Sequence, residues 1–442
     1  MDGMTFLQSV EKRRYDSFVA AHEQKSHFMQ SVAWGEFCMA ERGLKPHYVG
    51  MEDEAGALAA AALLLERKPM GFPPYFYSPR GFVIDFFDET LLALFTAEVA
   101  AFCKKRGAMF LKIDPDIELR EIDKNAEPVP GGADNSSLIG ELARLGFTHL
   151  GFNKGFEGRQ PRYTFRLDLL PEQAAILSRI EGNVLKNVRK CETNYVTEVY
   201  EGDDTDTLYE LITGTSERGS FFAYSKSFYR NFYSILSSYG MAALYFGKVY
   251  TKQTAESLRH QLAAVTEKRS AYKKERRLNE AALTERRLQR EAELFEAYAE
   301  KYGDEAVISA HLTVRYGKHA WAVHAGSSND MKETFLNNRV YLHKILEQKA
   351  HGAQWFDLFG TVGNPSEGPL KTLHEFKRQF GGRYIEFIGE FDMVFKPGWY
   401  RLYTGALPRY RALLFDFRAA LRKIAGMKKT GVTSGGVLQR GK

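Results

Sequence analysis

The amino-acid sequence predicts a mixed α+β (α/β) layered fold with a long helical arm inserted in its middle. Strand-like and helix-like runs alternate over residues 1–245, and the alternation resumes after residue 305, which is typical of packed sheets and helices. Between these regions, residues 252–301 contain neither Gly nor Pro. A chain of 442 residues exceeds the size at which one core stops growing, so we expect two domains besides the arm.

The first half of the chain starts with strands that are followed by a helix. Residues 46–66 have a strand-like pattern, residues 89–107 have a helical one, and the apolar run AMFLKID (108–114) is typical of a buried strand. The Pro- and Gly-rich segment EPVPGGADNSS (127–137) predicts an exposed loop.

The arm is predicted to be an antiparallel coiled-coil hairpin. Apolar residues recur at the 4/3 spacing of a coiled-coil seam: Leu258, Leu262 and Val265, then Leu288, Ala292 and Phe295. The phase is lost near Leu278, so we expect two antiparallel helices rather than one long rod, and helices of ~25 residues would reach roughly 35–40 Å from the body. The middle of the arm is basic and suits a large polyanion; its cations are Lys268, Arg269, Lys273, Lys274, Arg276 and Arg277.

After the arm, the pattern predicts two strands with a turn at 315–318, a helix over 331–350 and a strand at 354–360. Residues 102–115 and 346–360 both read as helix, Gly turn and apolar strand. This echo fits an internal duplication, but the same order also occurs as a common connection between unrelated elements. Both interpretations are open at this point.

The C-terminal residues combine a basic and an apolar face. A helical stripe over 409–424 holds Tyr410, Leu414, Phe417, Leu421 and Ile424, with Arg and Lys on the other faces. Such a helix can lie on an anionic membrane surface, or its stripe can dock on the body of the protein. Residues 427–442 are predicted to be a disordered basic tail.

Composition and motif searches exclude several classes of protein. Three dispersed Cys indicate a reducing compartment without a disulfide framework. No run approaches ~20 apolar residues and no leader is apparent, which predicts a cytosolic or peripheral protein. The sequence lacks GxxxxGK[ST], a GxGxxG after a strand, HExxH and GxSxG. We therefore expect neither a metal nor a bound cofactor.

Six motifs at predicted strand exits and helix starts resemble the FemABX family of peptidoglycan bridge aminoacyltransferases. They are QSVAWGEF (30–37), YSPRGFVID (77–85), LKIDPD (111–116), HAGSSND (324–330), LFGTVGNP (358–365) and HEFKRQFGG (374–382). The resemblance implies two tandem acetyltransferase-like (GNAT) domains. Their expected boundaries are 1–158 completed by 386–426, and 159–250 with 304–385, with the hairpin at 251–303.

The resemblance also implies a reaction and a set of residues. An amino acid (Gly, Ala or Ser) would move from aminoacyl-tRNA to the stem-peptide amine of a precursor, and the arm is typical of relatives that use lipid II. Asp114 matches the proton acceptor of the family and Lys377, beside Phe376, matches the group that stabilises the oxyanion. Arg80 stands where relatives carry a basic residue, and it would hold a phosphate or carboxylate of the precursor. Lys186 and Arg189 form a basic patch that suits pyrophosphate or tRNA, or else a solvated helix face. The charge of the arm suits tRNA. We expect a monomer or weak oligomer.

Two departures and two alternatives qualify this interpretation. Glu36 and Cys38 stand where some relatives carry a phosphate-binding Lys, and Tyr224 and Phe228 replace nucleotide contacts, which favours lipid-linked over nucleotide-linked precursor. The alternatives are an acetyl-CoA-dependent acetyltransferase, although no R/Q-x-x-G-x-G/A turn is evident, and a non-catalytic adaptor on membrane or RNA.

Overall fold

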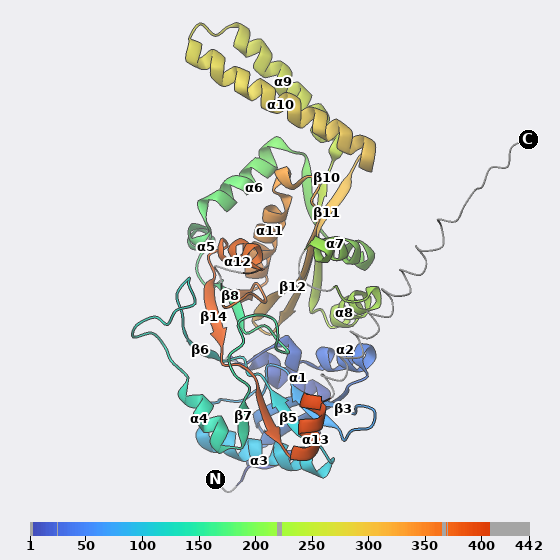
Figure 1. Ribbon diagram of the computed structural model, residues 1–442, viewed down its shortest axis with the longest axis vertical. Helices are drawn as coiled ribbons and strands as arrows, with labels where there is room; N and C mark the ends of the chain where they lie inside the picture. Colours follow the sequence, from blue (N-terminus) through green and yellow to red (C-terminus); the bar gives the residue numbers. More distant parts are fainter. Residues whose placement is uncertain (1–2, 24, 219–222, 365–367, 369, 407–442) are drawn as a thin grey trace, which may run out of the picture.

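The chain folds into two sheet-based lobes with a helical arm at one end (Figure 1). This computed structural model describes residues 3–23, 25–218, 223–364, 368 and 370–406. It confirms the predicted mixed α/β fold with two sheets. The predictions for 409–424 and 427–442 lie outside the described residues. None of the helices in the described part of the chain is long and apolar enough to cross a membrane.

The first lobe is built on a seven-stranded sheet. Its strands, in spatial order, are β1 (Thr5–Leu7), β2 (Lys45–Glu52), β3 (Leu58–Arg67), β4 (Tyr75–Ser78), β5 (Phe110–Ile113), β15 (Phe391–Val394) and β7 (Phe147–His149). Its helices are α1 (Lys12–Ala21), α2 (Val32–Arg42), α3 (Glu89–Lys105), α4 (Ser137–Arg144) and α13 (Pro397–Arg401). A short 3-10 turn, Phe28–Gln30, precedes α2, and a π-helical turn, Leu402–Ala406, follows α13.

The second lobe is built on an eight-stranded sheet. Its strands, in spatial order, are β6 (Glu118–Glu121), β14 (Arg383–Phe387), β8 (Tyr163–Asp168), β13 (Trp355–Asp357), β12 (His319–Ser327), β11 (Ala306–Tyr316), β10 (Ala242–Val249) and β9 (Thr197–Gly202). Its helices are α5 (Gln173–Arg179), α6 (Gly182–Asn194), α7 (Thr205–Arg218), α8 (Lys226–Ser238), α11 (Leu336–Ala350) and α12 (Lys371–Arg378). Strand β6 comes early in the chain but pairs here with β14, so the two lobes are threaded through one another.

The sequence echo corresponds to the same unit in each sheet. Helix α3 leads through Gly107 into β5, and α11 leads through Gly352 into β13; both glycines have the positive φ (74° and 81°) that ends a helix. Strand β5 pairs in parallel with β4, and β13 pairs in parallel with β12. Because the carboxyl ends of parallel strands lie at the same edge, side chains that follow these strands gather there.

One helix boundary differs from the sequence prediction. The helix expected over 331–350 begins at Leu336, because Met331 and Phe335 both have positive φ (61° and 56°), which no α-helix accommodates. A 3-10 turn, Lys332–Thr334, fills the gap.

A single apolar core joins the two lobes. Aromatic side chains from α2 and the turn before it pack against α8 and β12, with ring centroids of Phe28 and Trp321 5.0 Å apart and those of Phe37 and Phe232 5.1 Å apart. All four side chains are buried. A shared core of this kind holds domains in one relative position.

The arm is a helical hairpin of α9 (Thr251–Ser270) and α10 (Glu275–Tyr302). Leu258, Leu288 and Phe295 are buried along its seam, and ion pairs Arg259–Glu296 and Arg269–Glu285 cross between the helices at 2.7 and 2.6 Å.

The two antiparallel helices are joined at 271–274, inside the basic segment expected at the tip, and Leu278 already lies in α10. The apolar phase is lost there because this end of the hairpin is surrounded by solvent, not because the helix ends. Glu275 opens α10 with an acidic residue in the first turn, as the helix dipole favours.

Candidate active site

Asp114 lies directly after β5, at the edge of the first sheet that faces the second lobe. Its side chain is buried. Oδ1 accepts a 2.7 Å hydrogen bond from the backbone N–H of Arg80, and Oδ2 accepts a 2.9 Å bond from the hydroxyl of Tyr77. Burial raises the pKa of this carboxyl to about 6, against the opposing influence of the Arg80 charge. A carboxylate with such a pKa is suited to accepting a proton near neutral pH.

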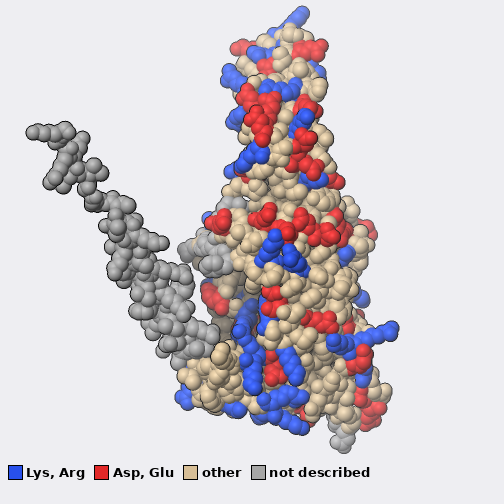
Figure 2. All heavy atoms as spheres, turned by 90° about the vertical axis from the view of Figure 1, so that its right-hand side faces the viewer, with Lys and Arg blue, Asp and Glu red and all other residues tan. Residues whose placement is uncertain are grey.

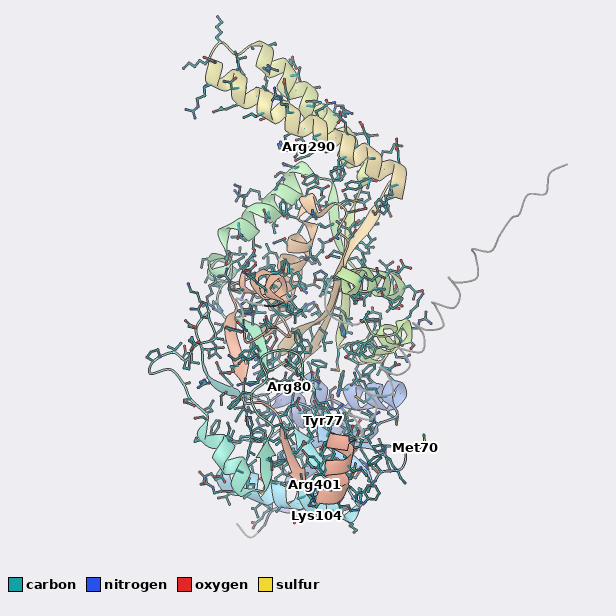
Figure 3. The ribbon with its side chains drawn as sticks, in the orientation of Figure 1. Met70, Tyr77, Arg80, Lys104, Arg290 and Arg401 are labelled. Carbon is teal, nitrogen blue, oxygen red and sulfur yellow. The ribbon has the colours of Figure 1, made fainter. Side chains whose placement is uncertain are left out.

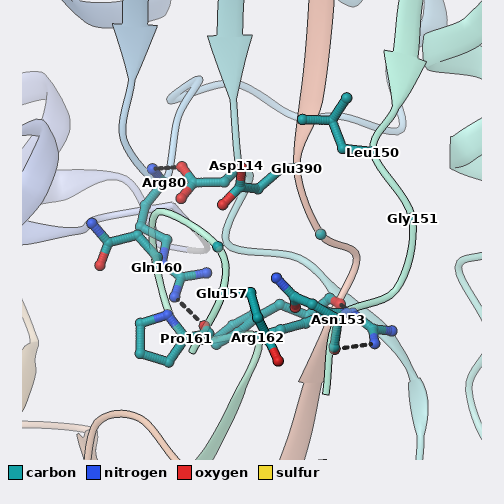
Figure 4. A pocket seen from close by; sticks show the side chains of 13 residues that line it. Arg80, Asp114, Leu150, Gly151, Asn153, Glu157, Gln160, Pro161, Arg162 and Glu390 are labelled. Carbon is teal, nitrogen blue, oxygen red and sulfur yellow. Dashed lines mark hydrogen bonds between the residues drawn. The ribbon is translucent and has the colours of Figure 1, made fainter. Parts of the chain in front are cut away.

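Arg80 connects this edge to the second lobe. It follows β4, and its backbone is in the left-handed region (φ 54°), which is costly for a side chain of this size. Its guanidinium donates a 2.7 Å bond to the carbonyl of Pro161 and lies 4.3 Å from the ring centroid of Phe387. Figure 4 shows Arg80, Asp114 and Pro161 around one cavity.

Lys377 lies in the second lobe, against the loop that follows β13. It lies on α12 and is buried, and its Nζ donates to the carbonyls of Phe359 and Gly360, the latter at 2.7 Å. These carbonyls follow β13, where Phe359 also has a positive φ of 56°. Burial lowers the pKa of the ammonium to about 7, and the carboxylate of Asp357 opposes this change. An ammonium has three N–H bonds, and these contacts use two of them.

Asp357 positions the loop that holds Lys377. Its Oδ1 accepts the Phe359 N–H at 2.7 Å, and its Oδ2 accepts a 2.9 Å bond from Arg166. Arg166 in turn donates to both oxygens of Asp116, at 2.6 and 2.8 Å. This buried network joins the ends of β13 and β5 across the two lobes, and it was not predicted from the sequence.

Four cavities meet between the lobes. The Asp114 cavity has about 270 Å³ and includes Arg80, Asn153, Arg162 and Glu390 (Figure 4). The Lys377 cavity has about 320 Å³ and is mainly apolar, with Tyr224, His324, Tyr341 and Phe359. The arginine cavity, of about 480 Å³, includes Arg42, Arg67 and Arg159. A fourth, of about 290 Å³, shares residues with each of the other three.

The segment 156–161 contributes to all four cavities. It belongs to the connection between β7 and β8, which runs from 150 to 162 and passes between the lobes. The sequence signal that could have identified it is a long Gly-rich connection, since loops of this length in a compact protein are usually functional. Asp114 lines one cavity and Lys377 lines another. The segment 156–161 lies between these two cavities, and its Pro161 lines both.

The other residues predicted for the precursor lie apart from these two. Phe376 packs against Tyr341 and Phe380, with centroids 5.0 and 5.3 Å apart, and it does not line the four cavities. Lys186 and Arg189 are exposed on α6, away from the cavities. Their contacts with substrate stay predictions.

The six cations of the arm lie at its far end, where all are exposed. Arg269 is paired with Glu285 and Arg276 with Glu280, which leaves four of the six without an ion pair among the described residues. Acidic side chains flank the tip along the shaft, as Figure 2 shows. The tRNA contact stays a prediction.

The departures noted in the sequence have structural roles here. Glu36 accepts hydrogen bonds from Lys12 and Tyr239, both at 2.7 Å. Tyr224 and Phe228 stack with centroids 4.0 Å apart and line the arginine cavity together with Cys38. Within the described ranges, no group of three or more His, Cys, Asp or Glu side chains could hold a metal ion.

Comparisons with known proteins agree with this architecture. Residues 10–407 match the family model described as the FemAB family. A lipid II:glycine glycyltransferase of Staphylococcus saprophyticus is 26% identical over 426 residues, covering 94% of this chain and 99% of the relative. An aminoacyltransferase FemA of Staphylococcus aureus is 26% identical over 407 residues, covering 88% of this chain and 95% of the relative. The crystal structure of FemX superimposes with a TM-score of 0.73 at 24% identity, covering 90% of this chain and 99% of that one.

Proposed function

This chain belongs to the FemAB family, and we propose that it transfers an aminoacyl group from aminoacyl-tRNA to the stem-peptide amine of lipid II. The observation that carries the proposal is a pair of buried ionisable groups at the facing edges of the two sheets. Burial moves the pKa of Asp114 up to about 6 and that of Lys377 down to about 7. Groups perturbed toward neutrality are typical of acid–base chemistry at an active site.

The proposed reaction is an acyl transfer from one oxygen to one nitrogen. The lone pair of the neutral amine attacks the ester carbonyl carbon, and a C–N bond forms as the carbonyl oxygen becomes an oxyanion. The ester C–O bond then breaks, and the ribose hydroxyl of the tRNA leaves. The proton lost by the amine passes to Asp114 and from there to the leaving oxygen. Because the tRNA ester is already activated, no cofactor is needed.

Lys377 is suited to stabilising the oxyanion. Its ammonium is held by two backbone carbonyls at the wall of an apolar cavity, and a fixed positive charge acts strongly where water is excluded. Aromatic side chains around it, including Tyr224 and Phe359, provide surfaces for the acyl-bearing end of a nucleic acid. The Lys377 and Asp114 cavities adjoin at Pro161, which lines both, so the two reactants would meet there.

Lipid-linked rather than nucleotide-linked precursor is proposed as the acceptor. The carboxylate of Glu36 is held by Lys12 and Tyr239, in the region where some relatives carry a phosphate-binding Lys. The enzyme would then work at the cytoplasmic face of the membrane, where it would meet the lipid-linked precursor.

A donor and acceptor assay tests the proposal. Purified protein is mixed with lipid II or a soluble lysine-containing analogue, and with tRNA charged with Gly, Ala or Ser, or with acetyl-CoA. We expect transfer from at least one charged tRNA and none from acetyl-CoA. Transfer from acetyl-CoA alone would instead identify an acetyltransferase, and tRNA binding without transfer from any donor would identify an adaptor.

A further inference from the structure

The end of the first lobe that lies opposite the arm exposes an unusual group of apolar side chains. Met70, at the tip of the β3–β4 connection, is 96% exposed, and Trp399 and Leu402 of the α13 region are 43% and 46% exposed. Figure 3 shows Met70 pointing away from the body on the side of this lobe. Exposed large apolar residues that gather in this way mark an interaction surface rather than ordinary solvent exposure.

These side chains stand on a rigid aromatic base. The ring of Phe72 contacts those of Trp399 and Tyr403, with centroids 5.8 and 5.4 Å apart, and Tyr75 lies 5.5 Å from Tyr403. Beneath them, Met109 and Phe110 are buried. The exposed side chains are therefore presented by a packed cluster that fixes the β3–β4 connection against α13.

The three segments that form this surface are strongly basic. The three segments that form it, 67–74, 102–109 and 395–406, contain no Asp or Glu. They contribute seven cations, which are Arg67, Lys68, Lys104, Lys105, Arg106, Lys396 and Arg401. Contacts tie the segments together: Lys396 donates to the carbonyl of Gly107 at 2.8 Å, and Lys104 lies 5.6 Å from the ring centroid of Phe395.

None of these seven cations forms an ion pair within the described part of the chain. Figure 3 places Lys104 and Arg401 at the end of the molecule away from the arm, and Figure 2 shows Lys and Arg gathering on the lower half of the molecule. The described chain ends at Ala406 beside this surface, and the sequence that follows is again rich in Arg.

We propose that this surface, formed by residues 67–74, 102–109 and 395–406, docks the protein on an anionic lipid bilayer. Acidic headgroups would neutralise the cations, while Trp399, Leu402 and Met70 would enter the boundary between headgroups and acyl chains. Tryptophan and tyrosine favour that boundary because each ring has an apolar body and a polar group. RNA would match the charge but offers no apolar phase for Met70 and Leu402, so the bilayer is the better partner.

The docking surface also borders the arginine cavity. Arg67 and Tyr75 belong to the wall of that cavity, and Tyr75 contacts Tyr403 of the surface. A lipid-linked substrate could then reach the cavity while its lipid stays in the bilayer. This step alone rests on the proposed function, whereas membrane docking does not.

Vesicle binding by the full chain tests the docking surface. Sedimentation with vesicles of phosphatidylcholine and phosphatidylglycerol should bring down the protein, and pure phosphatidylcholine should bring down much less. Met70→Ser, which removes no internal contact, should weaken binding about tenfold. Reversal of three exposed cations (Lys68→Glu, Lys104→Glu and Lys105→Glu) should weaken it by at least about 100-fold. The control reverses Lys268, Lys273 and Lys274 at the arm tip and should bind vesicles normally.

Fluorescence locates the contact. Of the four Trp side chains, Trp34 and Trp321 are buried, Trp355 is half-buried against His319, and Trp399 is exposed. Vesicles should therefore shift the emission of Trp399 to shorter wavelength. In Trp399→Phe, which keeps the ring contact with Phe72, the shift should disappear while binding persists. Equal binding of the triple variant and the parent, or a shift that persists in Trp399→Phe, would overturn the proposal. Loss of tRNA binding in the triple variant with normal vesicle binding would assign the surface to RNA.

Activity separates the docking surface from the proposed function. The triple variant should slow transfer to lipid II in vesicles by about tenfold or more, because docking concentrates the enzyme at its substrate, and should leave transfer to a soluble analogue unchanged. The parent enzyme can bind vesicles and the triple variant can lose this binding, while the parent transfers no aminoacyl group to either acceptor. In that case the proposed function is wrong and the docking surface stands.

Discussion

The backbone N–H of Arg80 donates a 2.7 Å hydrogen bond to Oδ1 of Asp114, across the ends of the parallel strands β4 and β5. The hydroxyl of Tyr77 holds the other carboxylate oxygen. Both donors are uncharged, so they orient the carboxylate without removing its negative charge. Burial then keeps it more basic than an exposed Asp, with a pKa of about 6. The carboxylate is thereby fixed in place and able to take a proton.

Replacing Asp114 with Asn should abolish most activity without unfolding the protein. The amide can still accept from the Arg80 N–H and can donate to the Tyr77 hydroxyl, but it cannot take up a proton. We expect transfer to fall by at least ~10²-fold, which is typical of a lost general base. The melting temperature should stay level or rise, since a carboxylate whose pKa is raised by burial destabilises the folded state at neutral pH. Asp85→Asn, at an exposed site, is the matched control.

The pH dependence of transfer should reflect both buried groups. Asp114 accepts a proton only above a pKa of about 6, and Lys377 carries its charge only below a pKa of about 7. The acidic limb of the rate profile should therefore have its midpoint near pH 6. The guanidinium of Lys377→Arg stays charged at all these pH values. The ionisation of the acceptor amine affects both enzymes equally and cancels in the ratio of their rates. The ratio of parent to variant rate should thus fall above about pH 7, and a constant ratio would contradict the role of Lys377.

The charge of the Arg80 guanidinium should influence the pKa at which Asp114 acts. Its charge lowers the pKa of Asp114 against the effect of burial. In Arg80→Met the backbone hydrogen bond to Asp114 remains, so the pKa of that carboxyl should rise and the acidic limb of the rate profile should move to higher pH. A purely structural role of Arg80 would lower the rate equally at every pH. Measuring kcat from pH 5 to pH 8 distinguishes the two results.

Removing the Lys377 ammonium should affect activity and stability differently. Lys377→Met should reduce turnover by at least ~10²-fold, as loss of an oxyanion donor does, whereas Lys371→Met at the exposed start of α12 should not. The pKa of Lys377 is about 7 in the folded protein and about 10.5 when unfolded, so the unfolded chain binds more protons between these values. The unfolding free energy of the parent, relative to Lys377→Met, should therefore rise from pH 7 to pH 10 by up to about 1.4 kcal/mol per unit.

Local sequence patterns predicted the helices and strands of this protein better than they predicted how these elements are connected and packed. The spacing around Leu258 and Leu288 identified the arm because a seam is a local periodicity. The run ending at Asp114 identified a buried strand for the same reason. The loss of apolar phase near Leu278 does not coincide with the turn at 271–274, because solvated residues at the tip give no apolar signal to mark it.

The arrangement of the site depended on long-range packing that no local pattern reveals. Asp114 and Lys377 were both predicted from family motifs, but the segment 156–161 between their cavities was not. The link from Asp116 through Arg166 to Asp357 joins residues 241 positions apart in the chain. Such contacts follow from how the two sheets are threaded, with β6 in the second sheet and β15 in the first.

The exposed arm offers a charge test for the tRNA donor. Reversing Lys273, Lys274, Arg276 and Arg277 should weaken tRNA binding and flatten its salt dependence, because fewer counterions are released when fewer phosphates are contacted. Arg276 is already paired with Glu280, so its reversal should contribute least. Binding measured over a series of salt concentrations gives the slope directly. The triple reversal at Lys68, Lys104 and Lys105 serves as the control, since Lys104 lies at the end of the molecule away from the arm (Figure 3). An unchanged slope in the arm variant would mean that the tip is solvated and that tRNA binds the body, where Arg42, Arg67 and Arg159 surround the largest of the four cavities between the lobes.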